Sequence, residues 1–267
     1  RHEDKLHNAV LLLDGGEIAA VRYKHDLPNY GVFDEKRVFA PGPLPGPINF
    51  RGVRLGVPIC EDIWTSDVCE CLVETGAEIL IVPNGSPFED GKFDVRLNHA
   101  VARVTETELP LIYVNQVGGQ DELVFDGGSF VINGDCALAL QLPTFEAGLV
   151  ISEWSEVDDQ WVCKVGERTA PHDGLGAIYR TMTLGLRDYV NKNRFPGVVL
   201  GLSGGIDSAL SAAVAVDALG PDRVWCIMLP SKYSSDHSLK DAIDCAELLQ
   251  CRLDKVAIEP AVTAYES

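Results

Sequence analysis

Residues 198–208 read VVLGLSGGIDS. The apolar start of this stretch predicts a buried strand, and the alanine-rich residues 208–219 predict a helix. The adjacent glycines Gly204 and Gly205 allow a tight turn that brings backbone N–H groups against a phosphate. A helix that begins at Ser208 would add its own unpaired N–H groups and the positive end of its dipole. The stretch therefore predicts a phosphate site in a strand–loop–helix unit, although it lacks the Gly-Lys-Ser/Thr ending of a Walker A loop.

Polar side chains in this loop fit the same role. Ser203 and Ser208 supply hydroxyl donors, and Asp207 would orient the loop or help to hold a metal ion. An ordinary glycine turn before a helix is the alternative, but it would need neither the paired serines nor the aspartate. We therefore interpret the stretch as a nucleotide-binding loop.

The sequence on both sides of the loop alternates between strand and helix patterns. This alternation is typical of successive βαβ units and predicts a parallel sheet in the second half of the chain. Helices are expected at 175–193, 208–219 and 238–249, and strands at 198–200, 224–229 and 255–258.

The first half of the chain also predicts an α/β layered domain. A hairpin is expected from strands 9–13 and 18–23. An acidic and polar stretch near residue 170 predicts a boundary that divides the chain into domains 1–170 and 171–267. Further strands are expected at 53–59, 79–82, 109–114 and 129–132, and a helix at 93–107.

Cys60 ends the apolar strand predicted at 53–59, and a helix is expected to follow it. A thiol at a helix N-terminus favours the thiolate, which can attack an amide carbonyl, so we expect Cys60 to be the most readily alkylated cysteine. Glu61 and Asp62 oppose thiolate formation, and Lys24 at the end of the hairpin is the candidate cation. Taken singly, Cys60 and Lys24 are better explained as a buried strand-end cysteine and a solvated lysine.

Composition argues against several classes of protein. The net charge of −18 disfavours nonspecific nucleic-acid binding, which requires a basic surface. No apolar run is long enough to span a membrane. The eight cysteines lie mostly in apolar stretches and are expected to be reduced thiols of a cytoplasmic protein. Cys69-Glu70-Cys71 lacks a second ligand pair at zinc spacing, so we expect no metal site made of protein side chains alone.

Two motifs resemble known superfamilies. Residues 203–208 (SGGIDS) resemble the SGGxDS loop of the ATP pyrophosphatases, which adenylate a substrate and release pyrophosphate. Lys24, three residues before Leu27, and Cys60 resemble the lysine and the nucleophile of the nitrilase superfamily, whose Glu-Lys-Cys triad lies on an αββα sandwich. The resemblance implies an α/β protein in which a nitrilase-like αββα sandwich is followed by a doubly wound parallel-sheet ATP pyrophosphatase domain, both incomplete.

Longer stretches resemble the family of glutamine-dependent NAD synthetases over nearly the whole chain. They are 24–39 (KHDLPNYGVFDEKRVF), 56–64 (GVPICEDIW), 84–88 (NGSPF), 114–127 (VNQVGGQDELVFDG) and 228–235 (MLPSKYSS, which includes Tyr233). The family hydrolyses glutamine and uses the ammonia to amidate deamido-NAD with ATP, for which magnesium is implied. By this resemblance glutamine, deamido-NAD and ATP are the substrates, and the full-length protein is expected to be a homo-oligomer.

The resemblance also implies roles for individual residues. Cys60 and Lys24 would be catalytic, and Lys24 would also stabilise the tetrahedral oxyanion. Glu35 and Glu61 would line the pocket. The family's glutamine-binding positions match Tyr30, Ser86 and Lys92. The alternative explanations for these three residues are a core tyrosine, a loop serine and a surface lysine. The family's ATP-binding positions match Gly201, Leu202, Ser203, Gly204, Gly205, Ile206, Asp207 and Ser208.

The match departs from the family at both ends of the chain. The family's general-base glutamate lies upstream of its lysine, whereas only Glu3 and Glu17 precede Lys24 and neither sits in that motif. We therefore expect a piece of a longer protein in which part of each domain is missing. Two alternatives stay open, namely another amidotransferase with a nitrilase half and an inactive truncated fragment.

Overall fold

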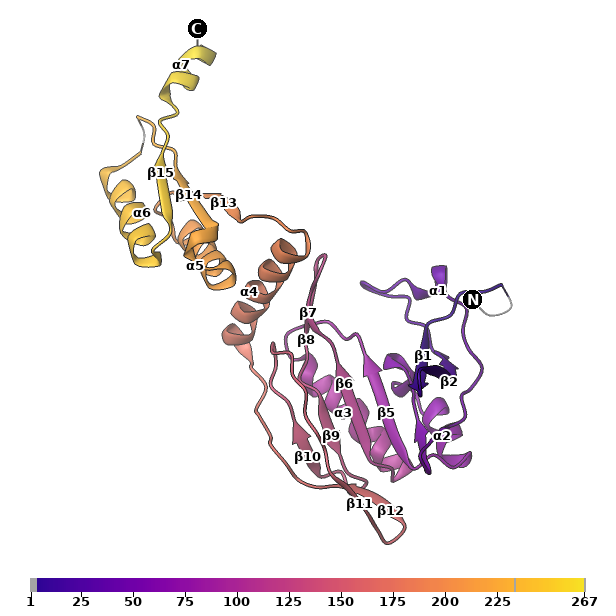
Figure 1. Cartoon of the computed structure of the whole chain (residues 1–267). Helices are drawn as coiled ribbons and strands as arrows, with labels where there is room; N and C mark the ends of the chain where they lie inside the picture. The colour runs from indigo at the N-terminus through magenta and orange to yellow at the C-terminus, as the bar shows by residue number, and fades with distance from the viewer. Residues whose placement is uncertain (1–3, 233, 267) are drawn as a thin grey trace. The chain divides into compact units, whose positions relative to one another are not determined.

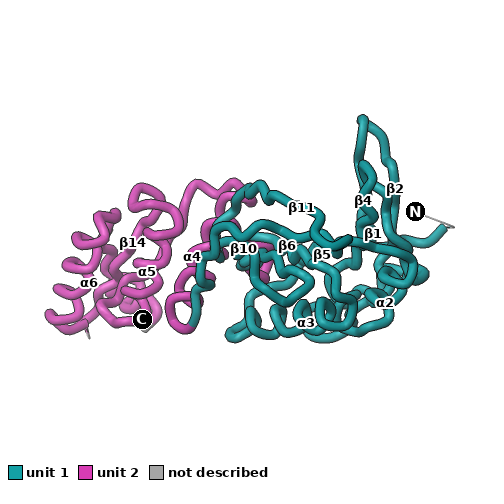
Figure 2. Tube along the Cα trace, turned by 90° about the horizontal axis from the view of Figure 1, so that it is seen from below, with its two compact units in different colours: residues 1–117, 125–173 teal, residues 118–124, 174–267 magenta. Residues whose placement is uncertain are grey.

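The computed structural model describes residues 4–232 and 234–266, so Glu3 and Tyr233 lie outside the described residues. Within the described ranges no helix is both long and apolar enough to cross a membrane. The chain forms two compact units, each with its own hydrophobic core and α/β structure, which confirms the predicted fold class (Figure 1). The units are residues 1–117 with 125–173, called unit 1, and residues 118–124 with 174–267, called unit 2 (Figure 2).

Unit 1 is built on a six-stranded mixed sheet. In sheet order its strands are β10 (Leu138–Gln141), β9 (Phe130–Ile132), β6 (Leu111–Asn115), β5 (Ile79–Asn84), β4 (Val53–Gly56) and β3 (Ile48–Phe50). β4, β5 and β6 run parallel, and the other neighbours pair antiparallel. The apolar run of β5 suits a strand that is covered on both faces at the centre of a layered domain.

Two helices cover one face of this sheet, α2 (Asp67–Glu74) and α3 (Lys92–Thr107) (Figure 2). Leu72 of α2 and Val104 of α3 share one core cluster with Leu80 of β5, and all three side chains are 0% exposed. Apolar residues at helical spacing meet the alternating apolar residues of the strands, which is how an α/β layer forms. This layer fixes the ends of β5 and β6, where the candidate site lies.

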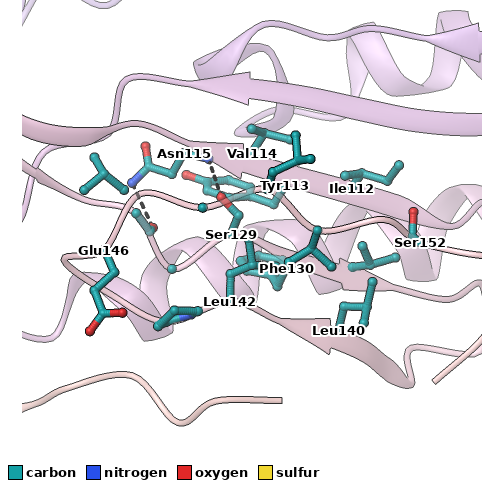
Figure 3. Close-up of a pocket in the computed structure, with 18 residues that line it drawn as sticks. Ile112, Tyr113, Val114, Asn115, Ser129, Phe130, Leu140, Leu142, Glu146 and Ser152 are labelled. Carbon is teal, nitrogen blue, oxygen red and sulfur yellow. Dashed lines mark hydrogen bonds between the residues drawn. The ribbon is translucent and has the colours of Figure 1, made fainter. Parts of the chain in front are cut away.

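The opposite face of the sheet carries the hairpin of β11 (Trp154–Val157) and β12 (Gln160–Cys163). A mostly apolar pocket of about 280 Å³ lies beside the strands β6, β9 and β10 (Figure 3). There the Asn115 N–H donates to the Ser129 hydroxyl at 3.0 Å, and the Asn115 side-chain amide donates to the Gly127 carbonyl at 3.2 Å (Figure 3). These hydrogen bonds fix the end of β6.

The predicted hairpin near the start of the chain is confirmed. β1 (Ala9–Asp14) pairs antiparallel with β2 (Glu17–Tyr23). Lys24 follows β2 directly, and its backbone N–H donates to the Asn8 carbonyl at 2.9 Å. Its carbonyl accepts a hydrogen bond of 2.7 Å from the Gly42 N–H. The backbone of Lys24 is therefore held on both sides.

Unit 2 contains the parallel sheet that the βαβ pattern predicts. Its elements are α4 (Gly174–Lys192), β13 (Val198–Gly201), α5 (Ile206–Leu219), η2 (Pro221–Arg223), β14 (Val224–Met228), α6 (Asp236–Leu249), β15 (Arg252–Lys255) and α7 (Glu259–Glu266). The sheet order β13-β14-β15 follows the sequence, so right-handed crossovers place α5 and α6 on the same face. Val199 on the other face is 61% exposed. The reversal of strand order that defines a doubly wound sheet is therefore not among these three strands.

One hairpin tip from the first half of the chain packs on α4 and belongs to unit 2. The hairpin consists of β7 (Val117–Gln120) and β8 (Leu123–Asp126). The Gly119 N–H donates to the Asp188 carboxylate at 2.8 Å, and the Gly119 carbonyl accepts from the Lys192 ammonium. The sequence did not predict this long-range contact.

The strand before Cys60 is shorter than predicted. It ends at Gly56 rather than at residue 59. Pro58 has no N–H to donate to a neighbouring strand, so residues 57–59 run on outside the sheet. Cys60 therefore follows a short loop, at the start of a 3-10 turn, and does not lie at a strand end.

Two elements of unit 2 also differ from the prediction. α5 begins at Ile206 rather than at Ser208, because Gly205 already has the backbone of an N-cap residue, with φ −87° and ψ 157°. The last strand is β15 and not 255–258, because Arg252 pairs with Trp225 of β14 and its guanidinium stacks on that indole, 3.9 Å from the ring centroid.

Candidate active site

Lys24 and Cys60, which lie far apart in the sequence, line one cavity of unit 1. The cavity has a volume of about 530 Å³ and forms where the start of β1, the end of β2 and the ends of β5 and β6 meet. The structure thus brings together the two residues that were predicted to be catalytic. Polar and aromatic neighbours in the lining include Asn8, Phe33, Glu35, Asn84 and Asn115, and Gly85 also lines the cavity.

The Lys24 side chain is enclosed and only 1% exposed. Its Nζ donates to Glu35 Oε1 at 2.9 Å, where Glu35 begins the short helix α1 (Glu35–Val38). Asn8 Nδ2 donates to the same oxygen at 3.4 Å. Glu35 Oε2 is buried and has no hydrogen-bond partner among the described residues, so it is available to a bound molecule. The ion pair fixes the ammonium group at the wall of the cavity.

Cys60 has a left-handed backbone with φ 53°, which is uncommon for a residue other than glycine. It begins η1 (Cys60–Ile63), a single 3-10 turn, and the longer helix α2 begins only at Asp67. The Gly85 N–H donates a hydrogen bond to the thiol. Residues with a strained backbone, as Cys60 has with its positive φ, cluster at functional sites.

Burial raises the pKa of the Cys60 thiol above its ordinary value. The Lys24 ammonium and the Gly85 N–H lower this pKa, Glu61 and Glu35 raise it, and burial prevails. The predicted thiolate at a helix N-terminus is therefore wrong for this structure, because one 3-10 turn cannot offset the burial. The thiol must give its proton to a base before it can attack.

Alkylation of the thiols should follow exposure. Contrary to the sequence-based expectation, iodoacetamide should modify the exposed Cys136 before the partly buried Cys60 at pH 7. Because the pKa of Cys60 is raised, its alkylation rate should still increase as the pH passes the ordinary thiol value of about 8.5. Peptide-resolved mass spectrometry against time and pH measures both rates. Faster modification of Cys60 than of Cys136 at pH 7 would contradict the raised pKa.

Two of the predicted glutamine-binding residues, Tyr30 and Lys92, lie in a cluster beside the cavity rather than in its lining. The Tyr30 hydroxyl donates to Glu61 Oε1 at 3.0 Å, and partial desolvation together with this hydrogen bond raises the pKa of Tyr30, although its side chain is about half exposed. Lys92 Nζ lies 3.0 Å from Glu89 Oε2 and 5.9 Å from the ring centroid of Trp64. The Tyr30 and Trp64 rings are 6.2 Å apart. Tyr30, Glu61, Trp64 and Lys92 thus form one polar and aromatic cluster next to the thiol loop.

The third, Ser86, belongs to a buried polar network. Its hydroxyl accepts from Arg96 Nε at 2.9 Å, and its N–H donates to Asn115 Oδ1 at 3.0 Å. Arg96 also forms an ion pair of 2.8 Å with Asp126 and donates to the Pro87 carbonyl. In this structure Ser86 shapes the loop after β5, and its hydroxyl also hydrogen-bonds to the Tyr113 phenol.

Ser86→Ala should lower the free energy of unfolding of this chain by about 1–3 kcal/mol, because the buried Arg96 Nε loses its acceptor. Urea denaturation of the 267-residue chain measures the loss. Ser155→Ala, at an exposed position of β11, is the matched control and should stay within about 0.5 kcal/mol of the unchanged chain. Equal stability of the two variants would contradict the network.

The glycine-rich loop borders a pocket of about 370 Å³ in unit 2. The pocket lies at the carboxyl ends of β13 and β14, where parallel α/β sheets bind their ligands. The N-terminus of α6 also borders it, and Ser235 caps this helix by accepting from the Ser238 N–H at 3.1 Å. Residues of the lining include Gly201, Leu202, Ser203, Ser234, Ser235 and Ser238.

The predicted ATP-binding residues differ in what they offer a ligand. The Ser203 and Ser208 hydroxyls lie 3.0 Å apart, and the Gly205 N–H donates to Ser203 Oγ at 3.2 Å. These bonds hold the turn together. Leu202 is 1% exposed and belongs to the core, so it can offer only its backbone, whereas Ile206 is 79% exposed.

Gly204 permits the close approach of the loop to α6. Its φ is +84°, and a Cβ there would lie 2.2 Å from the Ser238 carbonyl oxygen. Asp207 is exposed in the first turn of α5. Across residues 4–232 and 234–266, no group of three or more His, Cys, Asp or Glu side chains could hold a metal ion by itself.

Sequence reasoning missed several buried polar residues around the cavity. Asp62, Arg96 and Asn115 are all buried, whereas the sequence alone indicates Asp62 only as a charge that opposes the thiolate. For Arg96 a signal was present, since it shares one face of α3 with the buried Ala100 and Val104. A charged residue on the apolar face of a helix indicates a buried partner.

Comparisons with known proteins cover nearly the whole chain. The carbon-nitrogen hydrolase family model matches residues 1–158, and the NAD synthase family model matches residues 178–267. The glutamine-dependent NAD(+) synthetases of Rhodobacter capsulatus and Acinetobacter baylyi are 50% and 40% identical over 260 and 263 residues. These alignments include 97% and 98% of this chain but 47% and 48% of the relatives, so the chain spans about half the length of the curated relatives it matches.

Solved structures agree with these relatives. A glutamine-dependent NAD+ synthetase from Acinetobacter baumannii, in complex with ADP, has a TM-score of 0.92 and 39% identity over 99% of this chain and 50% of that chain. A second, from Cytophaga hutchinsonii, shares the fold with a TM-score of 0.78 at 20% identity over 99% of this chain and 52% of that chain. The resemblance to glutamine-dependent NAD synthetases is thereby confirmed, and the chain belongs to the carbon-nitrogen hydrolase family, with an NAD synthase match in its second half.

Proposed function

We propose that this chain carries the glutamine-hydrolysing site and the ATP-binding loop of a glutamine-dependent NAD synthetase. The observation that carries the proposal is the cavity that a buried, fixed ammonium group and a strained cysteine both line, in a chain that also has a glycine-rich loop before a helix. The first site would belong to a domain of residues 1–170 and the second to a domain of residues 171–267.

Cys60 would attack the side-chain amide carbonyl of glutamine. The Lys24 ammonium stabilises the oxyanion of the tetrahedral intermediate. The carbon–nitrogen bond then breaks, and the thiol proton ends on the departing ammonia while a γ-glutamyl thioester remains on Cys60. Water hydrolyses the thioester to glutamate and restores the thiol. Glu35 fixes Lys24, and its unpaired Oε2 would accept a hydrogen bond from the amide nitrogen.

The charged groups of glutamine would be bound beside the cavity. The cluster of Tyr30, Glu61 and Lys92 offers a carboxylate for the α-ammonium group and an ammonium for the α-carboxylate. Ser86 would fix the loop after β5 beside these groups. This division of charges suits a small zwitterion and disfavours simple aliphatic amides.

In unit 2, residues 201–208 would bind the phosphates of ATP through backbone N–H groups. The carboxylate of deamido-NAD then attacks the α-phosphorus and releases pyrophosphate, and ammonia displaces AMP to form the amide. Asp207 has the exposed carboxylate that would hold a magnesium ion together with phosphate oxygens. When bound, magnesium supplies neutralisation of the phosphate charge.

We also propose a cellular compartment and a class of partners for this protein. The eight cysteines are free thiols, which fits a protein of the reducing cytoplasm. The acidic composition supports small-molecule substrates and neither nucleic acid nor membrane as partners. We expect the full-length protein to be a homo-oligomer.

The adenylation step has a direct test. The full-length protein that contains this chain should convert deamido-NAD, ATP and ammonia to NAD, AMP and pyrophosphate in equal amounts. Chromatographic analysis of the nucleotides measures the three products. ADP and phosphate in place of AMP and pyrophosphate would rule out the acyl-adenylate.

A further inference from the structure

Asp62 is a buried carboxylate whose hydrogen-bond partners are backbone N–H groups of two separate segments. The side chain is 1% exposed. Oδ1 accepts from the N–H groups of His25 and Asp26 at 3.1 and 2.7 Å, and Oδ2 accepts from the Ile59 N–H at 2.8 Å. Bonds from N–H groups to an ionised acceptor are stronger than bonds between neutral groups.

The two segments are those that carry the catalytic pair. His25 and Asp26 directly follow Lys24, and Ile59 directly precedes Cys60. β2 pairs only with β1 among the described strands, and η1 lies outside the sheets, so no strand ladder joins the two segments. The carboxylate of Asp62 is therefore a direct hydrogen-bonded link between the lysine loop and the cysteine loop.

We propose that Asp62 is a positioning residue that sets the separation of the Lys24 ammonium from the Cys60 thiol. The inference rests on the proposed thiol chemistry of this site. Asp62 is absent from the lining of the cavity, so it acts through the backbone and does not touch the substrate.

If the Asp62 charge acted directly on the thiol, its removal would shift the pKa of Cys60 in the opposite direction. Removing a negative charge that acts through space would lower the pKa of Cys60, whereas moving Lys24 away would raise it, because the ammonium favours the thiolate. The groups that surround the thiol are Lys24, Glu35, Glu61, Tyr30, Tyr113 and the Gly85 N–H. Around Asp62 itself, Asp26 and Cys69 are the neighbouring titratable groups.

Asp62→Asn in this chain separates the two effects. Asparagine keeps one acceptor oxygen, but its NH₂ group cannot accept a hydrogen bond. The hydrogen bonds to at least one of the two segments are therefore lost. The alkylation rate of Cys60 against pH, followed by peptide-resolved mass spectrometry, should shift upward by about one unit and fall about tenfold at a pH below the midpoint. Asp67→Asn, which removes an exposed carboxylate at the start of α2, is the control and should leave the profile in place.

A second variant keeps the inference testable if the first does not fold. Asp62→Glu retains the charge and the acceptors but displaces them by one methylene, so a positional role predicts an upward shift and a charge role predicts none. An unchanged or lowered midpoint in folded Asp62→Asn or Asp62→Glu would overturn the inference, even if the unfolding temperature falls. The readout needs no glutamine, so failure of the full-length protein to hydrolyse glutamine would count against the proposed function alone.

Discussion

Cys60→Ala in the full-length protein should abolish glutamine-driven NAD synthesis and leave ammonia-driven synthesis unchanged. The thiol forms the covalent intermediate with glutamine and has no part in adenylation, which we assign to the loop of unit 2. Removal of a nucleophile from a covalent mechanism lowers the rate on the order of 10⁴–10⁶-fold. Parallel assays of NAD formation with each nitrogen source measure the two activities.

Cys136→Ala is the matched control for this substitution. Cys136 is an exposed free thiol on a turn of unit 1, and it lies outside the cavity of Lys24. Both activities should persist in this variant. Equal loss of glutamine-driven and ammonia-driven synthesis in Cys60→Ala would contradict the separation of the two sites.

Gly204→Val should remove ATP-dependent synthesis with either nitrogen source. The residue has φ +84°, which a β-branched side chain adopts only with strain, and its Cβ would lie 2.2 Å from the Ser238 carbonyl oxygen. Strain and overpacking together should lower the stability of unit 2 by about 2–5 kcal/mol and push the loop away from α6. Urea denaturation and NAD formation measure the two effects.

Gly176→Ala serves as the control for Gly204→Val within the same unit. Gly176 lies in α4, and a Cβ there would have nothing within 4 Å, so alanine should be neutral or stabilise by about 0.5–1 kcal/mol. Glutamine hydrolysis at Cys60 should survive in part in Gly204→Val, because the residues that line the Cys60 cavity belong to unit 1. Undiminished ATP turnover in Gly204→Val would remove the loop from the proposed ATP site.

Local sequence patterns predicted the elements whose regularity is encoded within a few residues. The apolar run of β5, the helical spacing of α3 and the turn of the first hairpin each specify their structure over a few residues. The glycine-rich loop was found for the same reason, because its conformation depends on Gly204 and Gly205 themselves. The predicted strand ends were less accurate where pairing with a distant strand sets the boundary. In β15, for example, Arg252 pairs with Trp225 of β14.

The sequence identified the two central residues of the candidate site but not the residue that holds their backbones in place. Lys24 and Cys60 belong to recognisable stretches, whereas Asp62 joins their backbones through contacts that no local pattern reveals. The ionisation of Cys60 was also mispredicted. Sequence position suggested a helix N-terminus, but burial is a property of the folded unit and it dominates the pKa.

Transfer of the amide nitrogen tests the central claim most directly. The full-length protein should be incubated with ATP, deamido-NAD and glutamine labelled with ¹⁵N in its side-chain amide, and the NAD analysed by mass spectrometry. We predict ¹⁵N in the nicotinamide of NAD, loss of this label in Cys60→Ala, and its return when ¹⁵N-ammonium replaces glutamine. Labelled NAD formed from glutamine by Cys60→Ala at the unaltered rate would contradict the account.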